Sequence, residues 1–281
     1  MNPALDTEVL AALEEAGLRV RSFLRISKLR SANNGRITYR IEHEGGTVKA
    51  RRLEDEATAR DLAALRSGLP DAFTRVVSRH GRVLIEEWIE GDPLPLAPER
   101  NHLLTAGALL ADLHASRTPG CRTLRAKCPT AAHRLRAHAR LSRLAGAGAL
   151  RKEEAAGLEG GLERCDPREA AYGLVHLDFC GENMVMDRAG RLRVVDNDRI
   201  RLDSLSFDLA RTWYRWALTA PQWDAFCLAY TSRLPFPQPE SLHFWKIVAA
   251  IQSAELRWHA YPEGAEVALR YLRALAQEET I

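Results

Sequence analysis

The spacing of hydrophobic residues near the start of the chain is that of strands, interrupted by one helix. In the segment RITYRIE, Ile37, Tyr39 and Ile41 alternate with polar residues, which is typical of a half-buried strand. The glycines of the following EGG segment indicate a turn, and TVKAR is predicted to form the return strand. An amphipathic helix over LEDEATARDLAALRSG and two strands within TRVVSRHGRVLIEEWIEGDPL complete this part of the chain. Residues 1–90 are therefore expected to form a small sheet-rich lobe with an inserted helix.

Beyond Gly91 the spacing of apolar residues becomes helical. The segment RNHLLTAGALLADLHAS carries leucines at helical intervals, and helical patterns resume from Leu205 to the C-terminus. The stretch VHLDFCGENMVMDRAGRLRVVDND, residues 175–198, interrupts them with two short apolar segments joined by the turn sequence DRAG. The sequence therefore predicts an α+β fold of two lobes, in which residues 91–281 form a larger helical lobe that contains one hairpin.

This hairpin places polar side chains at its open end. Asn183 begins its first strand, and Asp196 follows its second. The two residues face each other if the centre of the hairpin falls between Ala189 and Gly190, and a small slip in register leaves them neighbours. An amide oxygen beside a carboxylate suits Mg²⁺, which prefers oxygen ligands. We therefore predict Asn183 and Asp196 as metal ligands, with turn capping as the alternative role for both.

A loop before the hairpin supplies a further polar residue. Asp178 lies five residues before Asn183, where its carboxylate is suited to accept a proton from a hydroxyl group. One proton acceptor beside two metal ligands is the set of groups that phosphoryl transfer uses. The run from His176 through Asp178 to Asn183 matches the H-x-D-x-x-x-x-N signature of kinases, and a second metal-binding carboxylate follows it. Asp178 and Asn183 are accordingly the predicted catalytic residues.

The first lobe offers groups for binding the phosphates of ATP. Lys49 lies on the predicted strand TVKAR, and a strand lysine paired with a glutamate of the next helix accompanies this signature. We predict Glu56 as the partner, with Glu54 in reserve; the alternative is that Lys49 is a solvated surface lysine. The turn at Asn34 and Gly35 is predicted to cover the phosphates, unless it is an ordinary hairpin turn.

The segment LIEEWIEGDPL joins the two predicted lobes. We expect the backbone of Glu87, Trp88 and Ile89 to pair with the edge of the adenine, because main-chain N–H and C=O groups are strong hydrogen-bonding groups. The expected cofactors are therefore ATP and Mg²⁺.

Composition narrows the class of protein. The 281 residues are 46% hydrophobic and 27% charged, which describes a folded soluble chain, and a net charge of +3 argues against a nucleic-acid partner. A basic run from Arg117 to Lys152 is either a solvated helical face or a docking surface for an anionic substrate. The five cysteines lack the CxxC spacing of a zinc site. Without an export signal or a span of about 20 apolar residues, the chain is expected to be cytoplasmic, with no membrane partner.

Taken together, these motifs resemble the aminoglycoside phosphotransferase and choline kinase-like family. The resemblance runs from about Leu29 to Trp216 and is strongest in LVHLDFCGENMVMDRAGRLRVVDNDRIRLDSLSFDLAR. It implies a protein-kinase-like bilobal fold and ATP-dependent phosphorylation of a hydroxyl group on a small molecule. The acceptor is expected to be an aminoglycoside, an amino alcohol or a sugar-like compound.

The resemblance also implies roles for single residues. It gives the same roles to the residues assigned above, namely Lys49, Asp178, Asn183 and Asp196. Asp208, in the segment FDLAR, would fix the catalytic loop, and His176 would brace this loop rather than react. The chain departs from the family at Leu177, where glycine is usual, and at Asn197, where an aromatic residue is frequent. Neither departure removes a reacting group.

Two other functions share parts of this pattern. A protein kinase would carry the same signature, but no A-P-E segment follows Asp196 before FDLAR. A nucleotide-binding pseudoenzyme acting as a regulatory module would keep the fold, although the reacting groups are all present. The preferred reading is an enzyme, a small-molecule kinase.

Two further expectations concern side-chain environments. Trp213 and Trp216 are expected either to pack in the core or to form an apolar wall for the acceptor. Asp196 is expected to be repelled by two nearby acids, Asp178 and Asp198, when no cation is bound. Its replacement by alanine would then leave the protein without ligand at least as stable as before.

Overall fold

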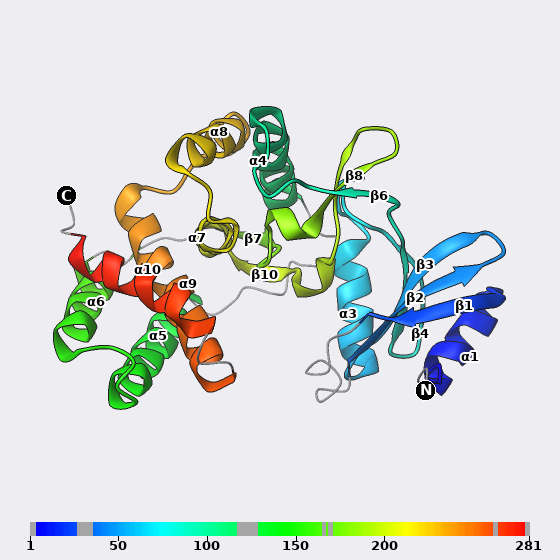
Figure 1. Ribbon diagram of the computed structural model, residues 1–281, viewed down its shortest axis with the longest axis horizontal. Helices are drawn as coiled ribbons and strands as arrows, with labels where there is room; N and C mark the ends of the chain where they lie inside the picture. The colour runs from blue at the N-terminus through cyan, green and yellow to red at the C-terminus, as the bar shows by residue number, and fades with distance from the viewer. Residues whose placement is uncertain are drawn as a thin grey trace. The chain divides into compact units, whose positions relative to one another are not determined.

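The chain folds into two compact units, one rich in strands and one in helices (Figure 1). Unit 1 consists mainly of Met1–Leu96 and Glu182–Arg201, and unit 2 of Ala97–Ala115, Gly120–Gly181 and Leu202–Ile281. This composition confirms the predicted α+β class. The hairpin groups with unit 1, whereas the division of the sequence at residue 90 left it in the second lobe. The computed structural model describes residues 4–26, 36–116, 129–164, 167, 171–260 and 264–278.

A five-stranded antiparallel sheet forms the centre of unit 1. The predicted alternation is present, since Tyr39 and Ile41 are buried and lie opposite Ala50 and Val48, respectively. Gly46 turns the chain between the second and third strands with a φ of 131°, a conformation that favours glycine. In spatial order the strands are β1 (Val20–Arg25), β2 (Ile37–His43), β3 (Gly46–Arg52), β5 (Val83–Glu87) and β4 (Val76–His80).

Helices α1 (Thr7–Glu15) and α3 (Glu56–Arg66) cover opposite faces of this sheet (Figure 1). Because side chains alternate along a strand, Lys49, Arg51 and Glu86 lie on the α3 face. The core on the α1 face includes Val9, Leu13, Val48, Ala50 and Ile85. The core on the α3 face is formed by Leu53, Ala59, Leu62 and Leu84.

The predicted hairpin is attached to unit 1 through backbone hydrogen bonds. Its second strand lies beside the loop that precedes β4, and the N–H of Val194 donates to the carbonyl of Ala72 at 2.8 Å. A third short strand completes a separate sheet with the hairpin. The strands of this sheet, in spatial order, are β6 (Gly91–Pro93), β8 (Met184–Asp187) and β9 (Leu192–Val194).

The register of the hairpin differs by one position from the predicted one. Met184 lies opposite Val194, so the centre falls half a position earlier than expected. Asn183 therefore faces Val195, whose N–H donates to the Asn183 carbonyl at 2.9 Å, rather than Asp196. Asp196 is the next residue along, so the two predicted ligands remain diagonal neighbours at the end of the hairpin.

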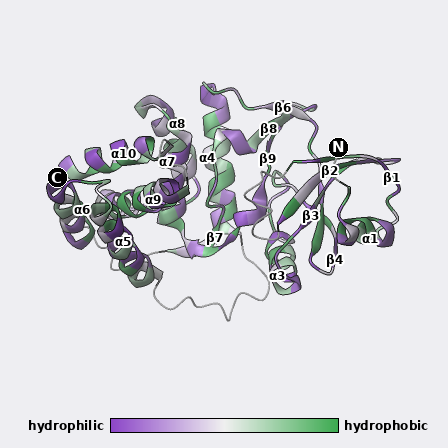
Figure 2. Ribbon diagram, turned by 60° about the horizontal axis from the view of Figure 1, so that its bottom comes forward, coloured by the Kyte–Doolittle hydropathy of each residue, from purple (hydrophilic) through white to green (hydrophobic). Residues whose placement is uncertain are grey.

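Unit 2 is built around the long helix α9 (Pro239–Ala260). Its side chains Phe244, Trp245 and Ile247 are fully buried among the neighbouring helices. Figure 2 shows hydrophobic and hydrophilic residues along each of these helices, as amphipathic helices require. The other elements are α4 (Arg100–Ala115), α5 (Pro129–Gly146), α6 (Lys152–Arg164), α7 (Leu205–Trp216), α8 (Ala220–Thr231), α10 (Ala265–Gln277) and the paired strands β7 (Tyr172–Val175) and β10 (Arg201–Ser204).

The part of the basic run that the structure describes makes ion pairs within unit 2. Arg140 and Arg143 of α5 both bind Glu255 of α9, with N–O distances of 3.0 and 2.5 Å. Part of the run therefore joins two helices. Cys180 and Cys227 are free thiols, and the other three cysteines lie outside the described residues. In the described parts of the chain, no helix combines the length and the apolar character that crossing a membrane requires.

Helices α4 and α8 approach so closely at Gly107 that a side chain would not fit. A Cβ atom there would lie 2.2 Å from the carbonyl oxygen of Phe226. We expect Gly107→Ala to lower the free energy of unfolding by about 1–3 kcal/mol, the usual cost of overpacking. Gly146→Ala, where nothing lies within 4 Å, should leave stability unchanged or slightly raised. Urea melts compare the two variants, and equal stability of both would contradict this close approach.

Candidate active site

Two predicted residues meet directly in unit 1. Lys49 on β3 places its Nζ 2.9 Å from Oδ1 of Asp196. Arg51, two residues further along β3, reaches the same oxygen with its Nη2 at 2.7 Å. Both cations share a strand face and converge on the predicted metal ligand. Sequence reasoning identified Lys49 and missed Arg51, whose signal is its position two residues later on the same face.

Asp196 sits in a turn with an unusual backbone conformation. Its φ of 60° and ψ of 47° are left-handed, which aspartate tolerates better than most residues. The next residue, Asn197, is buried and donates from its side-chain amide to the hydroxyl of Thr74 at 2.7 Å. The asparagine that replaces a frequent aromatic residue therefore anchors this turn to the rest of unit 1.

The charges around Asp196 differ from the expected ones. Burial opposes ionisation, but the charges and hydrogen bonds of Lys49 and Arg51 hold the pKa of Asp196 well below its ordinary value. Arg51 also binds Asp198, at 2.7 Å. The expected repulsion between Asp196 and Asp198 is therefore wrong, because Arg51 binds both carboxylates.

Asp196→Ala is accordingly expected to destabilise the protein in the absence of nucleotide. The substitution leaves Lys49 and Arg51 without the carboxylate that they share. Because the Asp196 side chain is 47% exposed, the loss is smaller than for a fully buried pair, about 1–2 kcal/mol. Thermal melts measure it, with Asp61→Ala, at an exposed aspartate of α3, as the control. A variant as stable as the parent would contradict this result and would indicate that Asp196 is repelled by other acids.

The predicted pairing of Lys49 with Glu56 is wrong. Glu56 is the first residue of α3, is 65% exposed and binds Arg79 at 3.2 Å. The reserve residue Glu54 pairs with another arginine. These acids precede the turns of α3 that pack on the sheet, so they do not reach the strand lysine. The Nζ of Lys49 lies instead 3.6 Å from Oε2 of Glu86 on β5.

Glu86 is a buried carboxylate on the sheet, with a side chain only 2% exposed. Arg66, from the last turn of α3, forms an ion pair with it and donates to the carbonyl of Thr74 at 2.8 Å. Burial alone would raise the pKa of Glu86, but the charges of Arg66, Arg51 and Lys49 lower it to about 2. Sequence reasoning missed Glu86, although two acids that end the apolar strand VLIEE are a signal for it.

The low pKa of Glu86 makes stability depend on pH. Its pKa is about 2 in the folded protein against an ordinary value of 4.5, so the unfolded chain binds more protons between these values. The contribution is complete above about pH 5 and is lost as pH falls toward about 2, for a total of roughly 3 kcal/mol. Glu86→Gln should therefore flatten the slope of unfolding free energy against pH in this range. Urea melts at several pH values measure the slope, and an unchanged slope would contradict a buried, ionised Glu86.

The other predicted metal ligand begins the hairpin. Asn183 ends the short 3₁₀ turn Gly181–Asn183, directly before β8. Its carbonyl is held by the N–H of Val195, which fixes the asparagine across the hairpin from the residue before Asp196. The predicted phosphate turn at Asn34 and Gly35 lies outside the described residues.

The segment predicted to bind adenine begins at Glu87, the last residue of β5. The N–H of Glu87 already donates to the carbonyl of Arg75 at 2.9 Å, so donors for a purine edge would come from Trp88 or Ile89. The carboxylate of Glu87 binds the guanidinium of Arg193 at 3.1 Å. Glu87 therefore has a structural role within unit 1 that the sequence did not suggest.

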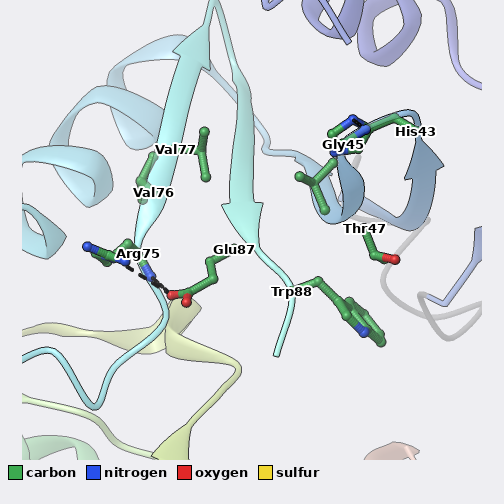
Figure 3. A pocket seen from close by; sticks show the side chains of 9 residues that line it. His43, Gly45, Thr47, Arg75, Val76, Val77, Glu87 and Trp88 are labelled. Carbon is green, nitrogen blue, oxygen red and sulfur yellow. Dashed lines mark hydrogen bonds and ion pairs between the residues drawn. The ribbon is translucent and has the colours of Figure 1, made fainter. Parts of the chain in front are cut away.

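A pocket of about 440 Å³ opens beside the end of β5 (Figure 3). Its lining includes Val48 and Trp88, and Figure 3 shows Arg75 and Glu87 in contact at one side of it. The residues that line this pocket do not include Lys49 or the two carboxylates beside Lys49, those of Glu86 and Asp196. The pocket is therefore distinct from the charged cluster of Lys49, Arg51, Arg66, Glu86, Asp196 and Asp198.

Unit 2 contains the predicted catalytic loop, which follows β7. Asp208 of α7 accepts the N–H groups of His176 and Leu177 at 2.6 and 2.7 Å, and its carboxylate is 3.1 Å from Nε2 of His114. Burial opposes ionisation of Asp208, but the hydrogen bond and charge of His114 keep its pKa below the ordinary value. The loop-fixing role implied for Asp208 is thus confirmed.

The departure at Leu177 has a cost in the backbone. Its φ is 64°, a left-handed conformation that favours glycine and costs other residues roughly 1–2 kcal/mol. The Leu177 side chain is buried, which offsets part of this cost. The imidazole of His176 is also buried and lies 3.3 Å from the N–H of Asp178, so it braces the loop.

The carboxylate of Asp178 is fixed by arginines of α7. The Nε of Arg215 lies 3.0 Å from Oδ1 of Asp178, and a guanidinium nitrogen of Arg211 lies 4.0 Å from the same oxygen. Arg211 also donates to the carbonyl of Leu177 at 2.6 Å. Sequence reasoning missed both arginines, although their spacing of four in RTWYR places them on one helix face.

The two tryptophans of α7 occupy different environments. Trp213 packs edge-on against Tyr271, and the ammonium of Lys246 lies 4.4 Å from the centre of its ring. Trp216 packs against Phe179 of the catalytic loop, and a Cβ at Gly181 would lie 2.8 Å from its Nε1. Trp216 therefore supports the loop that carries Asp178.

Comparison with known proteins gives one family and many similar structures. The sequence matches the model of the phosphotransferase enzyme family over residues 27–245. No curated protein has a sequence that matches the chain significantly. Among solved structures, a choline kinase from Streptococcus pneumoniae has a TM-score of 0.68 and 15% identity, covering 95% of this chain and 98% of its own.

Two further structures have the same fold with other activities in their names. A macrolide 2′-phosphotransferase from Brachybacterium faecium has a TM-score of 0.64 and 13% identity, covering 97% of this chain and 98% of its own. An ethanolamine kinase from Plasmodium vivax has a TM-score of 0.61 and 10% identity, covering 90% of this chain and 81% of its own. At sequence identities this low, the structural similarity establishes a common fold and nothing further.

Proposed function

Because the chain belongs to the phosphotransferase enzyme family, we propose that it is an ATP- and Mg²⁺-dependent kinase that transfers the γ-phosphate to a hydroxyl group of a small molecule. The family match confirms the resemblance that the motifs indicate, and with it the classification as a phosphotransferase. The finer assignments, which are the nucleotide, the metal and the acceptor, are proposals that the residues support.

The observation that carries the proposal is the fixed loop around Asp178. Asp208 holds the backbone of His176 and Leu177, and Arg215 holds the carboxylate of Asp178. A carboxylate held in place in this way is suited to orient a hydroxyl group and to accept its proton. We assign this role to Asp178.

The residues at the end of the hairpin fit a magnesium ion. The carboxylate of Asp196 and the amide of Asn183 are hard oxygen donors, and Mg²⁺ takes few protein ligands and shares the rest with water and phosphate. Bound there, the ion would neutralise charge that develops on the transferred phosphate. Lys49 and Arg51, which contact Asp196 in the structure, are the cations available to phosphate oxygens.

The proposed acceptor is an amino alcohol, a sugar-like compound or an aminoglycoside. The similar structures are named for choline, ethanolamine and macrolide substrates, which all carry hydroxyl groups. Arg211 and Arg215 place positive charge at Asp178. This charge favours acceptors of low positive charge over polycationic aminoglycosides.

A screen with ATP and Mg²⁺ tests the proposal. The panel comprises choline, ethanolamine, sugars, nucleosides, a macrolide and aminoglycosides, and mass spectrometry detects the phosphate ester. We expect one class of hydroxyl compound to be phosphorylated with release of ADP. Nucleotide binding without transfer to any acceptor, in the panel or in a metabolite extract, would favour a regulatory pseudoenzyme instead.

A further inference from the structure

The acid that pairs with the strand lysine comes from a different element in this chain than in the kinase signature. In the kinase signature, the lysine pairs with a glutamate of the following helix, and activity requires that pair. Here helix α3 contributes a buried cation, Arg66, and the carboxylate comes from β5 as Glu86. We infer that Glu86, held by Arg66, positions Lys49 for the phosphates of the nucleotide, and that Arg51, on the same strand face, binds them beside it. The inference rests on the proposed function and adds a second phosphate-binding cation to it.

The carboxylate of Glu86 bridges the helix and the strand. Its Oε1 binds Arg66, and its Oε2 lies 3.6 Å from Nζ of Lys49. Glu86 and Lys49 are directly opposite each other in the β3–β5 ladder, so the backbone fixes their pairing. Arg66 is fixed in turn by the carbonyl and hydroxyl oxygens of Thr74, at 2.8 and 3.3 Å. The contacts therefore run from α3 through Glu86 to the strand cation.

Exposure rises along this chain of contacts. The side chains of Arg66 and Glu86 are 0% and 2% exposed, whereas those of Lys49 and Asp196 are 13% and 47% exposed. The buried carboxylate of Glu86 lies between Arg66 and Lys49, whereas the exposed carboxylate of Asp196 can give up its cations to a ligand. Phosphate oxygens are therefore expected to replace Asp196 at the strand cations and to leave Glu86 in place. Arg66 is needed because burying the ionised carboxylate of Glu86 would cost free energy if no cation were paired with it.

Arg51 has donors for phosphate oxygens once Asp196 is displaced from it. Its side chain is 6% exposed and reaches Asp196 and Asp198, both at 2.7 Å. Among the described residues, its Nε is buried without a hydrogen-bond partner. A guanidinium offers several donors in a planar fork that matches phosphate oxygens. Lys49 and Arg51 thus form a two-cation site, with Glu86 as the acid behind it.

Glu86→Gln tests the inference because it keeps the shape of the side chain and removes its charge. We expect the Kd of a fluorescent ATP analogue to rise about ten- to hundred-fold, as is usual when a charged hydrogen-bond partner is lost. The KM for ATP should rise in parallel, while kcat at saturating ATP changes less. A purely structural role would lower the amount of active protein and leave KM unchanged. Asp61→Asn, at an exposed acid of helix α3 in the same unit, is the control.

Two further variants separate the competing explanations. If Arg66 acts through Glu86, the double variant Glu86→Gln/Arg66→Gln should bind nucleotide no more weakly than Glu86→Gln alone. Glu56→Gln examines the helix acid that the kinase signature would favour, and we expect it to leave the KM for ATP unchanged. A rise in KM for Glu56→Gln, with none for Glu86→Gln, would overturn the inference.

A crystal structure of the unaltered protein with Mg²⁺ and a non-hydrolysable ATP analogue decides the matter even if the variants fail to fold. Glu86 should remain beside Lys49, and both Lys49 and Arg51 should contact phosphate oxygens. An acid of α3 in the place of Glu86, or an Arg51 that contacts no phosphate, would overturn it. If the unaltered protein binds no nucleotide, the proposed function fails; equal binding by the unaltered protein and Glu86→Gln refutes the inference alone.

Discussion

Asp178→Asn is expected to lower turnover by about 10²–10⁴-fold, the usual loss when a general base is removed. Asparagine keeps the shape of the side chain and one oxygen for Arg215, but it does not accept the proton of the acceptor hydroxyl. The residues proposed to bind the nucleotide, Lys49 and Asp196, belong to unit 1, whereas Asp178 belongs to unit 2. The affinity for ATP should therefore stay close to that of the parent.

Steady-state kinetics on the phosphorylated acceptor, together with the Kd of a fluorescent ATP analogue, measure both parts of this result. Asp224→Asn, at an exposed aspartate of α8, is the control for the loss of a negative charge in unit 2. Unchanged turnover in Asp178→Asn would contradict the assignment of Asp178 as the proton acceptor. A parallel loss of nucleotide affinity would instead indicate that the substitution disturbs the fold.

Asp208→Ala is expected to lower the free energy of unfolding by about 3–5 kcal/mol, because it removes a fully buried carboxylate that several hydrogen bonds hold. The substitution removes the acceptor for the N–H groups of His176 and Leu177 and leaves His114 without its carboxylate. Those N–H groups are buried, so each lost hydrogen bond adds to the cost. Turnover should fall as well, because the loop that carries Asp178 loses its anchor.

Urea melts of the whole protein measure this effect, with tryptophan fluorescence as the signal, because most of the tryptophans belong to unit 2. Asp208→Asn retains one amide oxygen and should lose less stability than Asp208→Ala, while Asp224→Ala, at an exposed position, should lose little. Equal stability of Asp208→Ala and the parent would show that the loop is held by other contacts, and the assignment of its anchor would then be incorrect.

The strands of unit 1 and the motif in the loop were predictable because both depend on local sequence. The alternation of Ile37, Tyr39 and Ile41 has the period of a strand, and Gly46 supplies the conformation that the turn requires. The spacing from Asp178 to Asn183 is likewise a property of neighbouring residues. Such features need no knowledge of which distant segments pack together.

The partner of Lys49 was not predictable in the same way. Which acid reaches Lys49 depends on the pairing of β3 with β5 and on the face that α3 turns to the sheet, and both are set by tertiary packing. The exposed Glu56 precedes the packed turns of the helix, whereas Glu86 lies opposite the lysine. Arg215 is a similar case, since its contact with Asp178 joins residues far apart in the sequence.

The register of the hairpin was missed because of its turn. The loop between Asp187 and Arg191 has three residues and ends with Gly190 at a φ of 72°, so the centre falls on a residue rather than between two. The sequence DRAG predicts a turn here but does not distinguish between loops of different length. The slip moved Asn183 by one position and left it next to Asp196 along the hairpin.

Transfer of an isotopically labelled phosphoryl group tests the central claim most directly. ATP carrying ¹⁸O at the three non-bridging oxygens of its γ-phosphate is incubated with Mg²⁺, the protein and the acceptor that the screen identifies. If a hydroxyl of the acceptor attacks the phosphorus, mass spectrometry will find all three labelled oxygens in the phosphate ester, joined through the acceptor's own unlabelled oxygen. This product should form with the unaltered protein and be nearly absent with Asp178→Asn. Release of labelled inorganic phosphate alone, at equal rates for both proteins, would contradict the account.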